Sequence, residues 1–309
     1  MDKKLIKPET GKGVEKVEKQ IIDYSTYLSK LAVQSLIEQI ELTPKPGLVD
    51  QQNSGAHSDL SFELMIKSAR ALKDTFTKMA YVSFDLEPSQ FLREEIAAIG
   101  RIGESIMYQT TEGVNTHKGA IWTLGLLVSA AAMKKETNIE KVAATAGRLA
   151  RYPDRYCPLI PTNGLRVIER FAVQGAKGEA EQGFPHIVKF AMPALRDSRQ
   201  AGIAENLARL NALITLIANL DDTCILHRGG VKALALTKKY ASDILSRGGV
   251  STPEGWHLLQ QLDEVFIRLN ISPGGSADLL AGTLFLDSLN RGQLGGDDGP
   301  DFVKPYELV

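Results

Sequence analysis

The sequence contains only two cysteines, Cys157 and Cys224, in 309 residues. They do not form a C-x-x-C pair, so neither a disulfide framework nor a zinc site built on paired cysteines is predicted. Scarce, unpaired cysteines are typical of proteins of the reducing cytosol, and we expect a cytoplasmic location. The charged segment 1–19 has no apolar core and lacks the pattern of a secretory signal peptide.

An excess of charge of one sign is also lacking, since 36 Lys and Arg residues nearly balance 37 Asp and Glu residues. We therefore expect no nucleic-acid partner and no membrane partner, because nucleic acids and anionic membranes attract basic surfaces. The longest apolar run, 119–133, is interrupted by Thr123 and Ser129. It is shorter than the roughly 20 residues that a membrane span requires. This run is better interpreted as a buried helix.

No segment alternates β-branched residues around a hairpin turn, so no sheet is predicted. Apolar residues recur instead at helical spacing, in windows rich in Ala and Leu. These windows are 17–41, 60–79, 88–109, 115–134, 139–151, 164–173, 186–200, 203–220, 231–247, 253–269 and 276–289.

No stretch has the composition of an interdomain linker, and no internal repeat occurs. We therefore predict an all-α fold, with a single multi-helix domain over residues 1–309 and an active site built from interhelical loops. The polar ends, 1–16 and 292–309, are predicted to be flexible. The apolar helices would also allow a homo-oligomer.

Glycine, proline, histidine, aspartate and lysine gather in five loops between these windows. The segment 113–119, Gly-Val-Asn-Thr-His-Lys-Gly, opens the apolar run. Unpaired N–H groups and the positive dipole end of a helix bind phosphate, Lys118 adds a charge, and Asn115 and Thr116 add donors. The alternative is a core helix capped by Asn115 with an exposed lysine. The coincidence of cation, donors and glycines favours phosphate binding, although the spacing is not that of a Walker A loop.

The segment 221–230, Asp-Asp-Thr-Cys-Ile-Leu-His-Arg-Gly-Gly, follows an apolar helical window. Two aspartates at a helix end oppose the helix dipole, and a divalent cation would compensate them. Mg²⁺ favours one or two carboxylates together with substrate phosphates, which makes Asp221 and Asp222 candidate ligands. Arg228 would pair with phosphate. The alternative is an ion pair between these aspartates and Arg228 or His227.

The segment 272–278, Ser-Pro-Gly-Gly-Ser-Ala-Asp, leads into a helix that is apolar nearly all round. Ser276 suits an N-cap, and Asp278 would lie in the first turn. A dipole-stabilising role would account for Asp278 but not for the preceding Gly-Gly pair. The segment is not a G-x-S-x-G nucleophile elbow, because no strand precedes it.

The segment 43–50, Thr-Pro-Lys-Pro-Gly-Leu-Val-Asp, is stiffened by two prolines. The prolines are best interpreted as helix terminators. The stiff loop would hold Lys45 and Asp50 in place, and Asp50 suits a structural role as well as a functional one.

The segment 54–59, Ser-Gly-Ala-His-Ser-Asp, precedes a helical window, and Ser58 or Asp59 is the predicted N-cap. His57 lies outside this helix and suits a structural role as well as a functional one. A sixth, weaker cluster of glycines at 175–183 could form an anion nest, but a plain surface loop is the preferred interpretation.

Together the loops indicate a helical enzyme that handles a phosphorylated ligand with Mg²⁺. Over residues 35–289 the chain resembles the triphosphoribosyl-dephospho-coenzyme A synthases. The resemblance rests on five motifs in order: Pro44–Asp50, Gly55–His57, Gly113–Ile121, Asp221–Gly230 and Gly274–Ala281.

Two branches of this family serve malonate decarboxylase and citrate lyase. The sequences of residues 175–186 and Leu220–Cys224 are more similar to the malonate decarboxylase branch than to the citrate lyase branch. Leu60 and Ser61 stand where many members have Met-Asp, so the resemblance assigns no catalytic role to Ser61.

The resemblance implies that ATP and 3′-dephospho-CoA yield 2′-(5″-triphosphoribosyl)-3′-dephospho-CoA and release adenine. The first product would be a precursor in an acyl carrier protein pathway. Loss of adenine builds oxocarbenium character, which carboxylates stabilise, while an acid protonates the base. As catalytic candidates we take Asp50, His57, Asp222 and Asp278. The candidates for contacts to ATP are Lys45, Asn115, Thr116, His117, Lys118, Arg228 and Ser276. Asp221 and Asp222 would hold Mg²⁺ on the triphosphate, or one of them would act as base, and His117 and His227 are further candidates to protonate adenine.

Two other functions fit the same residues. A helical Mg²⁺-dependent hydrolase of nucleotides or ADP-ribosyl substrates would use the Asp-rich loops with water as acceptor. A nucleotide-binding or scaffold protein without turnover would bind ligand and release no adenine, but the density of Asp and His in stiff loops disfavours it.

Overall fold

The computed structural model describes residues 12–158 and 162–294, and within these ranges all regular structure is helical. The prediction of an all-α fold is confirmed. The helices are α1 (Lys12–Glu41), α2 (Phe62–Ala71), α3 (Lys73–Ser83), α4 (Gln90–Thr110), α5 (Lys118–Lys134), α6 (Ile139–Ala150), α7 (Asn163–Phe171), α8 (Gly175–Glu181), the π-helical turn η1 (Ile187–Ala191), α9 (Met192–Gln200), α10 (Glu205–Asn219), α11 (Thr223–Ser246), α12 (Pro253–Leu269) and α13 (Gly274–Leu294).

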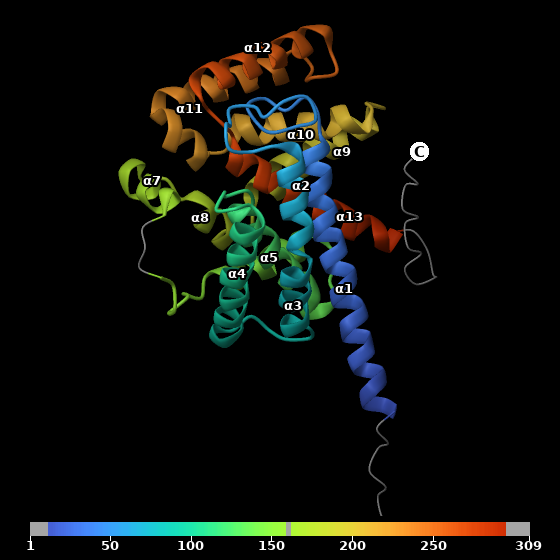
Figure 1. Ribbon diagram of the computed structural model, residues 1–309. Coiled ribbons are helices and arrows are strands. Elements are labelled where there is room, and N and C mark those ends of the chain that lie inside the picture. The colour runs from blue at the N-terminus through green and yellow to red at the C-terminus, as the bar shows by residue number, and fades with distance from the viewer. Residues whose placement is uncertain (1–11, 159–161, 295–309) are drawn as a thin grey trace, which may run out of the picture.

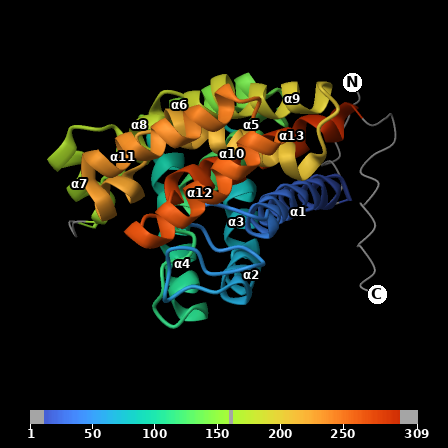
Figure 2. The same ribbon diagram turned by 90° about the horizontal axis from the view of Figure 1, so that it is seen from above.

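Two apolar helices form the centre of the fold. α5 is buried along nearly its whole length and packs against α1, α3, α4, α6 and α13. α13 in turn packs against α1, α10 and α11. Figure 1 shows α1 to α4 running alongside one another, with α10, α11 and α12 crossing above them, and Figure 2 shows α11 beside α12 from above. Because α5 is apolar all round, one continuous core extends from Leu28 to Leu289.

Side-chain caps explain where several helices begin. Ser61, Ser89 and Thr252 each accept a hydrogen bond from the backbone N–H three residues further on. Such caps satisfy N–H groups that have no partner within the helix. The cap of α2 is Ser61, so the prediction that Ser58 or Asp59 caps this helix is wrong.

The structure corrects two helix boundaries. The predicted window 60–79 is divided between α2 and α3, which meet at Leu72. α11 begins at Thr223, well before the predicted start at Val231, and it bends at Gly230, where φ is +66°. Gly229 and Gly230 led to the prediction of a loop before Val231. The chain instead bends at Gly230 and is helical on both sides of the bend.

The segment 175–183, for which a plain surface loop was the preferred interpretation, contains helix α8. Its two glycines disfavour a helix when the sequence is considered alone. Burial decides the outcome, since Glu179 and Ala180 lie in the interior and α8 packs against α5, α6 and α7.

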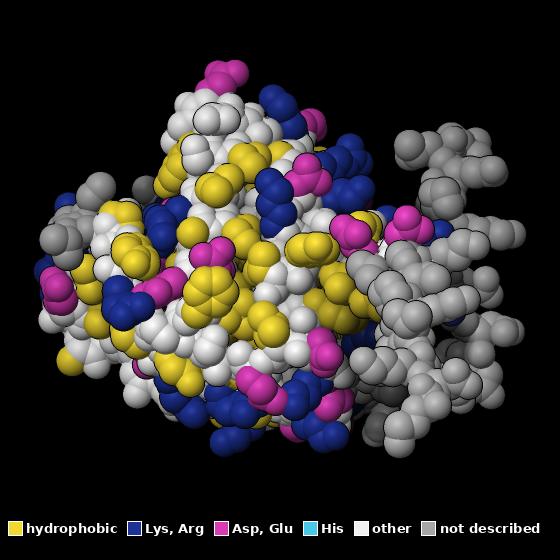
Figure 3. All heavy atoms as spheres, turned by 90° about the horizontal axis from the view of Figure 1, so that it is seen from below, with side chains coloured by type: hydrophobic (Ala, Val, Ile, Leu, Met, Phe, Trp, Pro, Cys, Tyr) yellow, Lys and Arg dark blue, Asp and Glu magenta, His cyan; other side chains and the backbone are white. Residues whose placement is uncertain are grey.

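Parts of the predicted flexible ends are helical, since residues 12–16 belong to α1 and residues 292–294 to α13. The remaining parts, 1–11 and 295–309, lie outside the described residues. Within the described ranges no helix has both the length and the hydropathy needed to cross a bilayer. On the face shown in Figure 3, hydrophobic side chains lie among charged side chains of both signs. The prediction of a homo-oligomer is not tested by this arrangement.

Candidate active site

Asp222 joins two of the five loops. As the N-cap of α11 it accepts, through Oδ1, hydrogen bonds from the N–H groups of Cys224 at 2.8 Å and Ile225 at 3.4 Å. Oδ1 also accepts from the Gly275 N–H at 3.3 Å, and Oδ2 accepts from the N–H and the hydroxyl of Ser276 at 2.8 and 2.9 Å. The side chain is completely buried. Asp222 therefore fastens the first turn of α13 to the first turn of α11.

Asp278 occupies a space that a glycine leaves open. A Cβ at Gly119 would lie 1.9 Å from Oδ2 of Asp278 and 2.9 Å from its carboxyl carbon, closer than real Cβ contacts. The Ala120 N–H stabilises the Asp278 carboxylate, so this side chain occupies the positive end of α5. The predicted phosphate loop and the Gly-Gly-Ser-Ala-Asp loop thus meet at Asp278.

Asp222 and Asp278 form an interacting carboxyl pair. Burial raises the pKa of Asp278 well above its ordinary value, and the charge of Asp222 raises it further. Burial also raises the pKa of Asp222, but four backbone and side-chain donors oppose this effect. Because Asp222 accepts many more hydrogen bonds than Asp278, the negative charge of the pair belongs on Asp222 and the proton on Asp278. Asp278 keeps partial exposure, whereas Asp222 has none.

His57 and Arg228 form a second cluster. Arg228 donates to Nδ1 of His57 at 3.1 Å and to the backbone oxygen of Ala56 at 2.9 Å. Since arginine cannot accept a hydrogen bond, His57 carries its proton on Nε2 and donates to the Ser272 hydroxyl at 2.8 Å. Burial and the Arg228 charge lower the pKa of His57 to about 4, so the imidazole is neutral at pH 7.

The second cluster borders a polar cavity of about 440 Å³. The cavity is lined by Ala56, His57, Ser58, Asp59, Asn163, His227, Arg228 and Asn270. Within the described part of the chain Arg228 forms no ion pair with a carboxylate, because its donors go to carbonyl oxygens, the Asn270 side chain and His57. Its charge is therefore available to an anionic ligand in the cavity. We call this space the His57 cavity.

The predicted phosphate loop meets Asp278 at Gly119, and most of its polar groups already have partners within the protein. The Asn115 side chain accepts from the Lys118 N–H at 3.2 Å, but the N-cap residue of α5 is His117 and not, as was predicted, Asn115. Lys118 forms an ion pair with Glu104 at 2.8 Å, and Thr116 is hydrogen-bonded to Ser68 at 2.6 Å.

His117, the N-cap residue of α5, is buried. Its Nε2 donates to the backbone oxygen of Met65 at 3.0 Å, and burial lowers its pKa to about 4. The side chain thus stays neutral and links α5 to α2.

Lys45 and Asp50 are both buried in the stiff loop. Asp50 accepts from the backbone N–H groups of Lys45, Gln52 and Asn53, so its carboxylate organises the loop. Lys45 donates through Nζ to the backbone oxygen of Gln39 at 2.6 Å, and burial lowers its pKa to about 7. Neither residue borders the His57 cavity, and their predicted contacts with substrate remain predictions.

The two adjacent aspartates differ sharply. Asp221 is exposed and pairs with Lys238 at 2.6 Å, whereas the buried Asp222 has both oxygens occupied by donors. In this arrangement they do not fit a shared Mg²⁺ site. Among the described residues no three His, Cys, Asp or Glu side chains lie close enough together to bind a metal ion. Magnesium binding remains a prediction.

Comparison with known proteins decides the family. Residues 25–296 match the family described as ATP:dephospho-CoA triphosphoribosyl transferase. The chain belongs to this family. A relative from Azotobacter vinelandii, named a probable 2-(5''-triphosphoribosyl)-3'-dephosphocoenzyme-A synthase, is 49% identical over 262 residues, which cover 84% of this chain and 90% of the relative.

Another relative of this transferase, the 2-(5''-triphosphoribosyl)-3'-dephosphocoenzyme-A synthase of Klebsiella pneumoniae, is 46% identical over 85% of this chain and 94% of its own length. A Pseudomonas fluorescens relative is 45% identical, over 89% and 96% respectively. No solved structure matches the chain. Membership of the family makes the protein a transferase, and the alternative of a hydrolase finds no support.

Sequence reasoning assigned no role to several residues of the transferase that border the site. Ser272 belongs to a predicted loop, but only the fold brings its hydroxyl to His57. Glu104 lies within a helical window and carries no local motif. Its pairing with Lys118 follows from the packing of α4 against α5, which sequence spacing alone does not reveal.

Proposed function

We propose that this protein transfers the triphosphoribosyl group of ATP to the 2′-hydroxyl of 3′-dephospho-CoA and releases adenine. The observation that carries the proposal is the Asp278 carboxyl group, which is partly exposed, has a raised pKa and lies beside the buried Asp222. A carboxylic acid with a raised pKa keeps its proton to a higher pH than an ordinary carboxyl group, and is suited to donate that proton to a leaving group.

The bond between C1″ of the ATP ribose and the adenine nitrogen breaks, and its electron pair stays with adenine. Asp278 protonates the departing base, and the carboxylate it becomes stabilises the positive charge that develops at C1″. The 2′-hydroxyl oxygen then bonds to C1″ and loses its proton to Asp278, which restores the acid. The triphosphate stays on the transferred ribose.

Asp222 acts in this scheme as a positioning residue. It is fully buried and its oxygens accept backbone and hydroxyl donors, so it contacts no substrate. Its negative charge helps to keep the proton on Asp278. It also fastens α13, the helix that carries Asp278, to α11, the helix that carries Arg228.

The His57 cavity is the proposed site of the triphosphate. Arg228 supplies a charge without a carboxylate partner, and an arginine pairs well with phosphate oxygens. The positive end of α5, where phosphate binding was predicted, is already next to the Asp278 carboxylate. Lys118 and Asn115 remain proposed contacts of the bound nucleotide, and Mg²⁺ is proposed to bind through the phosphates of ATP.

The product is the precursor of an acyl carrier protein's prosthetic group, and we propose malonate decarboxylase as its destination. This proposal is supported by the sequence of residues 175–186, which resembles the malonate decarboxylase branch. These residues form α8 and the turn before η1. Burial of Glu179 and its 2.6 Å bond to His186 show that this segment has a structural role as well. Transfer of the labelled product to a malonate decarboxylase carrier protein, but not to a citrate lyase carrier, would support this branch.

The first test replaces Asp278 with Asn, which keeps the size of the side chain and removes the acid. We expect kcat for adenine release to fall by about 100-fold or more, because positioned acids and bases contribute about 10² to 10⁴. The matched control is Asp243→Asn, at an exposed position of α11. The assay is adenine release from ATP and dephospho-CoA, with mass spectrometry of the product.

A folded Asp278→Asn protein with a near-normal rate would remove Asp278 from the mechanism. Incubation of the wild-type protein with ATP alone tests the transfer itself. Rapid adenine release without dephospho-CoA would mean that water is the acceptor and would contradict the proposed function.

A further inference from the structure

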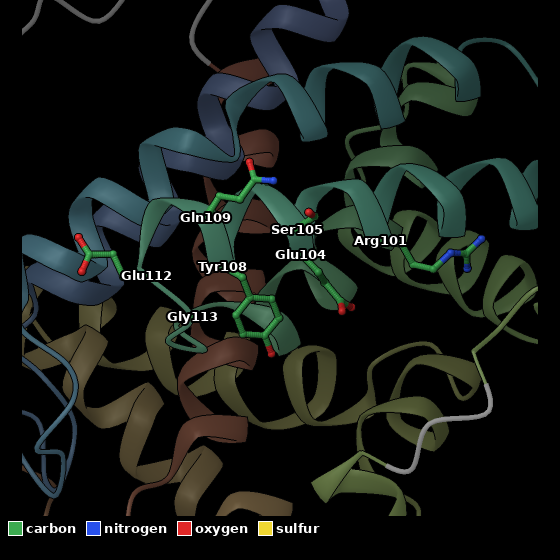
Figure 4. Close-up of a pocket in the computed structure, with 7 residues that line it drawn as sticks. All are labelled: Arg101, Glu104, Ser105, Tyr108, Gln109, Glu112 and Gly113. Atoms are coloured by element: carbon green, nitrogen blue, oxygen red, sulfur yellow. The ribbon is translucent and has the colours of Figure 1, made fainter.

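A second cavity, shallow and open to solvent, has a volume of about 650 Å³ and lies along α4. It is lined by Arg101, Glu104, Ser105, Tyr108, Gln109, Glu112 and Gly113. Figure 4 shows the side chains of Glu104 and Tyr108 extending from α4 toward the same side. Apart from Gly113, no lining residue belongs to the loops that the sequence singled out. We call this space the Tyr108 cavity.

The Tyr108 cavity is linked to Asp278 through the contact between α4 and α5. Glu104, which lines it, pairs with Lys118 at 2.8 Å, and the next residue is Gly119, against which Asp278 packs. The His57 cavity is linked to the carboxyl pair through α11, which is capped by Asp222 and carries Arg228. A transfer between two nucleotides needs one binding site for each nucleotide, and both sites must lead to the same reacting group.

Charges differ between the cavities. In the Tyr108 cavity the cation Arg101 is paired with Asp154 at 2.5 Å, and two glutamates, Glu104 and Glu112, also line the wall. This wall therefore offers a cation for phosphate oxygens and carboxylates that accept hydrogen bonds from the hydroxyl and amino groups of a ligand. A triphosphate is better accommodated by the unpaired Arg228 of the His57 cavity.

A buried cation lies further along α4. Arg93 is only 7% exposed, and its guanidinium carbon lies 5.0 Å from the centre of the Trp122 ring. Among the described residues its Nε has no hydrogen-bond partner. The neighbouring carboxylates are engaged elsewhere, Glu94 with Arg155 and Asp154 with Arg101. Burial of a cation with an unsatisfied hydrogen-bond donor is costly, and an anionic ligand would compensate it.

We propose that the Tyr108 cavity binds the adenosine diphosphate part of the acceptor, dephospho-CoA. The adenine ring lies against Tyr108, close to the Lys118 end of α5, and the diphosphate extends along α4 toward Arg101 and Arg93. Tyr108 and Arg101 are separated by about 10 Å along the helix, given the rise of 1.5 Å per residue. The ribose of the acceptor then lies near Glu104, whose partner Lys118 precedes Gly119, the residue that Asp278 contacts.

This assignment rests on the proposed function, because it takes dephospho-CoA as the acceptor. The test is therefore a direct binding measurement that needs no turnover. Wild-type protein and variants are titrated calorimetrically with dephospho-CoA, alone and with saturating inorganic triphosphate to fill the His57 cavity. Separate titrations use ATP without dephospho-CoA.

The informative variants are Arg101→Gln and Tyr108→Leu. Each is expected to weaken dephospho-CoA binding about tenfold, the effect of losing one charge-assisted or stacking contact, while the Kd for ATP changes less than twofold. The matched control is Arg148→Gln, because Arg148 is an exposed arginine that lines neither cavity. Thermal unfolding of each variant separates lost binding from lost folding, and Tyr108→Phe, which keeps the ring, should bind like wild type.

Unchanged dephospho-CoA binding in both folded variants would overturn the cavity assignment and leave the proposed function standing. An equal loss of ATP binding would overturn it as well, because the cavity would then belong to ATP. Failure of the wild-type protein to bind dephospho-CoA under either condition would overturn the function and the assignment together.

Discussion

Replacement of Gly119 by alanine tests the geometry at Asp278 most directly. The added Cβ would lie 1.9 Å from Oδ2 of Asp278, and real contacts do not fall below 3.0 Å. The carboxyl group must therefore move by at least about 1.1 Å, the difference between these distances. Misplacement of a reacting group by about 1 Å can cost on the order of 100-fold in rate, so we expect kcat to fall by about that factor.

Stability provides a second measurement of the same change. Alanine inside a helix is favoured over glycine by about 1 kcal/mol, but forcing extra volume into a packed site costs about 1–3 kcal/mol. The expected net result for Gly119→Ala is a loss of up to about 2 kcal/mol in the free energy of unfolding, measured with urea. Displacement also exposes the carboxyl group, so the fall in activity at high pH should begin at a lower pH.

Gly100→Ala is the matched control. Gly100 lies in α4, and the nearest atom to its added Cβ is the flexible Met79 methyl group at 3.4 Å, an ordinary contact. This variant should keep the wild-type kcat and gain up to about 1 kcal/mol in stability. If Gly119→Ala behaved like Gly100→Ala in rate and in stability, Asp278 would not occupy the position on which the mechanism depends.

Two further predictions concern buried charge. Arg93→Met should raise the thermal unfolding midpoint of the ligand-free protein, because it keeps apolar volume and removes a buried cation whose Nε has no hydrogen-bond partner among the described residues. A fall of several degrees would show that Arg93 is satisfied within the protein. Burial raises the pKa of Asp278 in the folded state, so folded protein binds more protons than unfolded protein between the ordinary carboxyl pKa of 3.8 and the higher folded value. The Asp278 contribution to stability is therefore fully present below that window and is lost as the pH rises through it. Asp278→Asn should not lose stability in this way, so its stability relative to wild type, measured by urea unfolding, should increase with pH. Parallel profiles of stability against pH for the two proteins would contradict the raised pKa.

Local signals were sufficient for most of the helices. The helical spacing of apolar residues predicted α5 and α12 closely, because the apolar residues of both helices and the Thr252 cap of α12 are local properties of the chain. They failed where packing overrides local preference. α8 contains glycines and forms because Glu179 and Ala180 are buried, and α2 and α3 separate at Leu72 without any proline or glycine there to mark the break.

The candidate site divides in the same way. The clustering of Gly, Asp and His in loops singled out Asp222, Asp278 and Arg228, because residues that combine stiff backbone and charge are recognisable without a structure. The different roles of these residues could not be recognised from the sequence. Asp221 and Asp222 are neighbours in sequence, yet one is on the surface with Lys238 and the other is completely buried.

By itself the sequence determined an all-helical fold and a set of loops suited to a phosphorylated substrate, since periodicity, capping and residue type act over a few positions. Only the tertiary structure decided that Asp278 lies against Gly119 and that Glu104 meets Lys118. The first contact joins helices that are far apart in the chain and the second joins consecutive helices, and both depend on how the apolar faces of α4, α5 and α13 pack. The raised pKa of Asp278 is a product of that packing, because burial and the nearby Asp222 cause it, and neither is a property of a local segment.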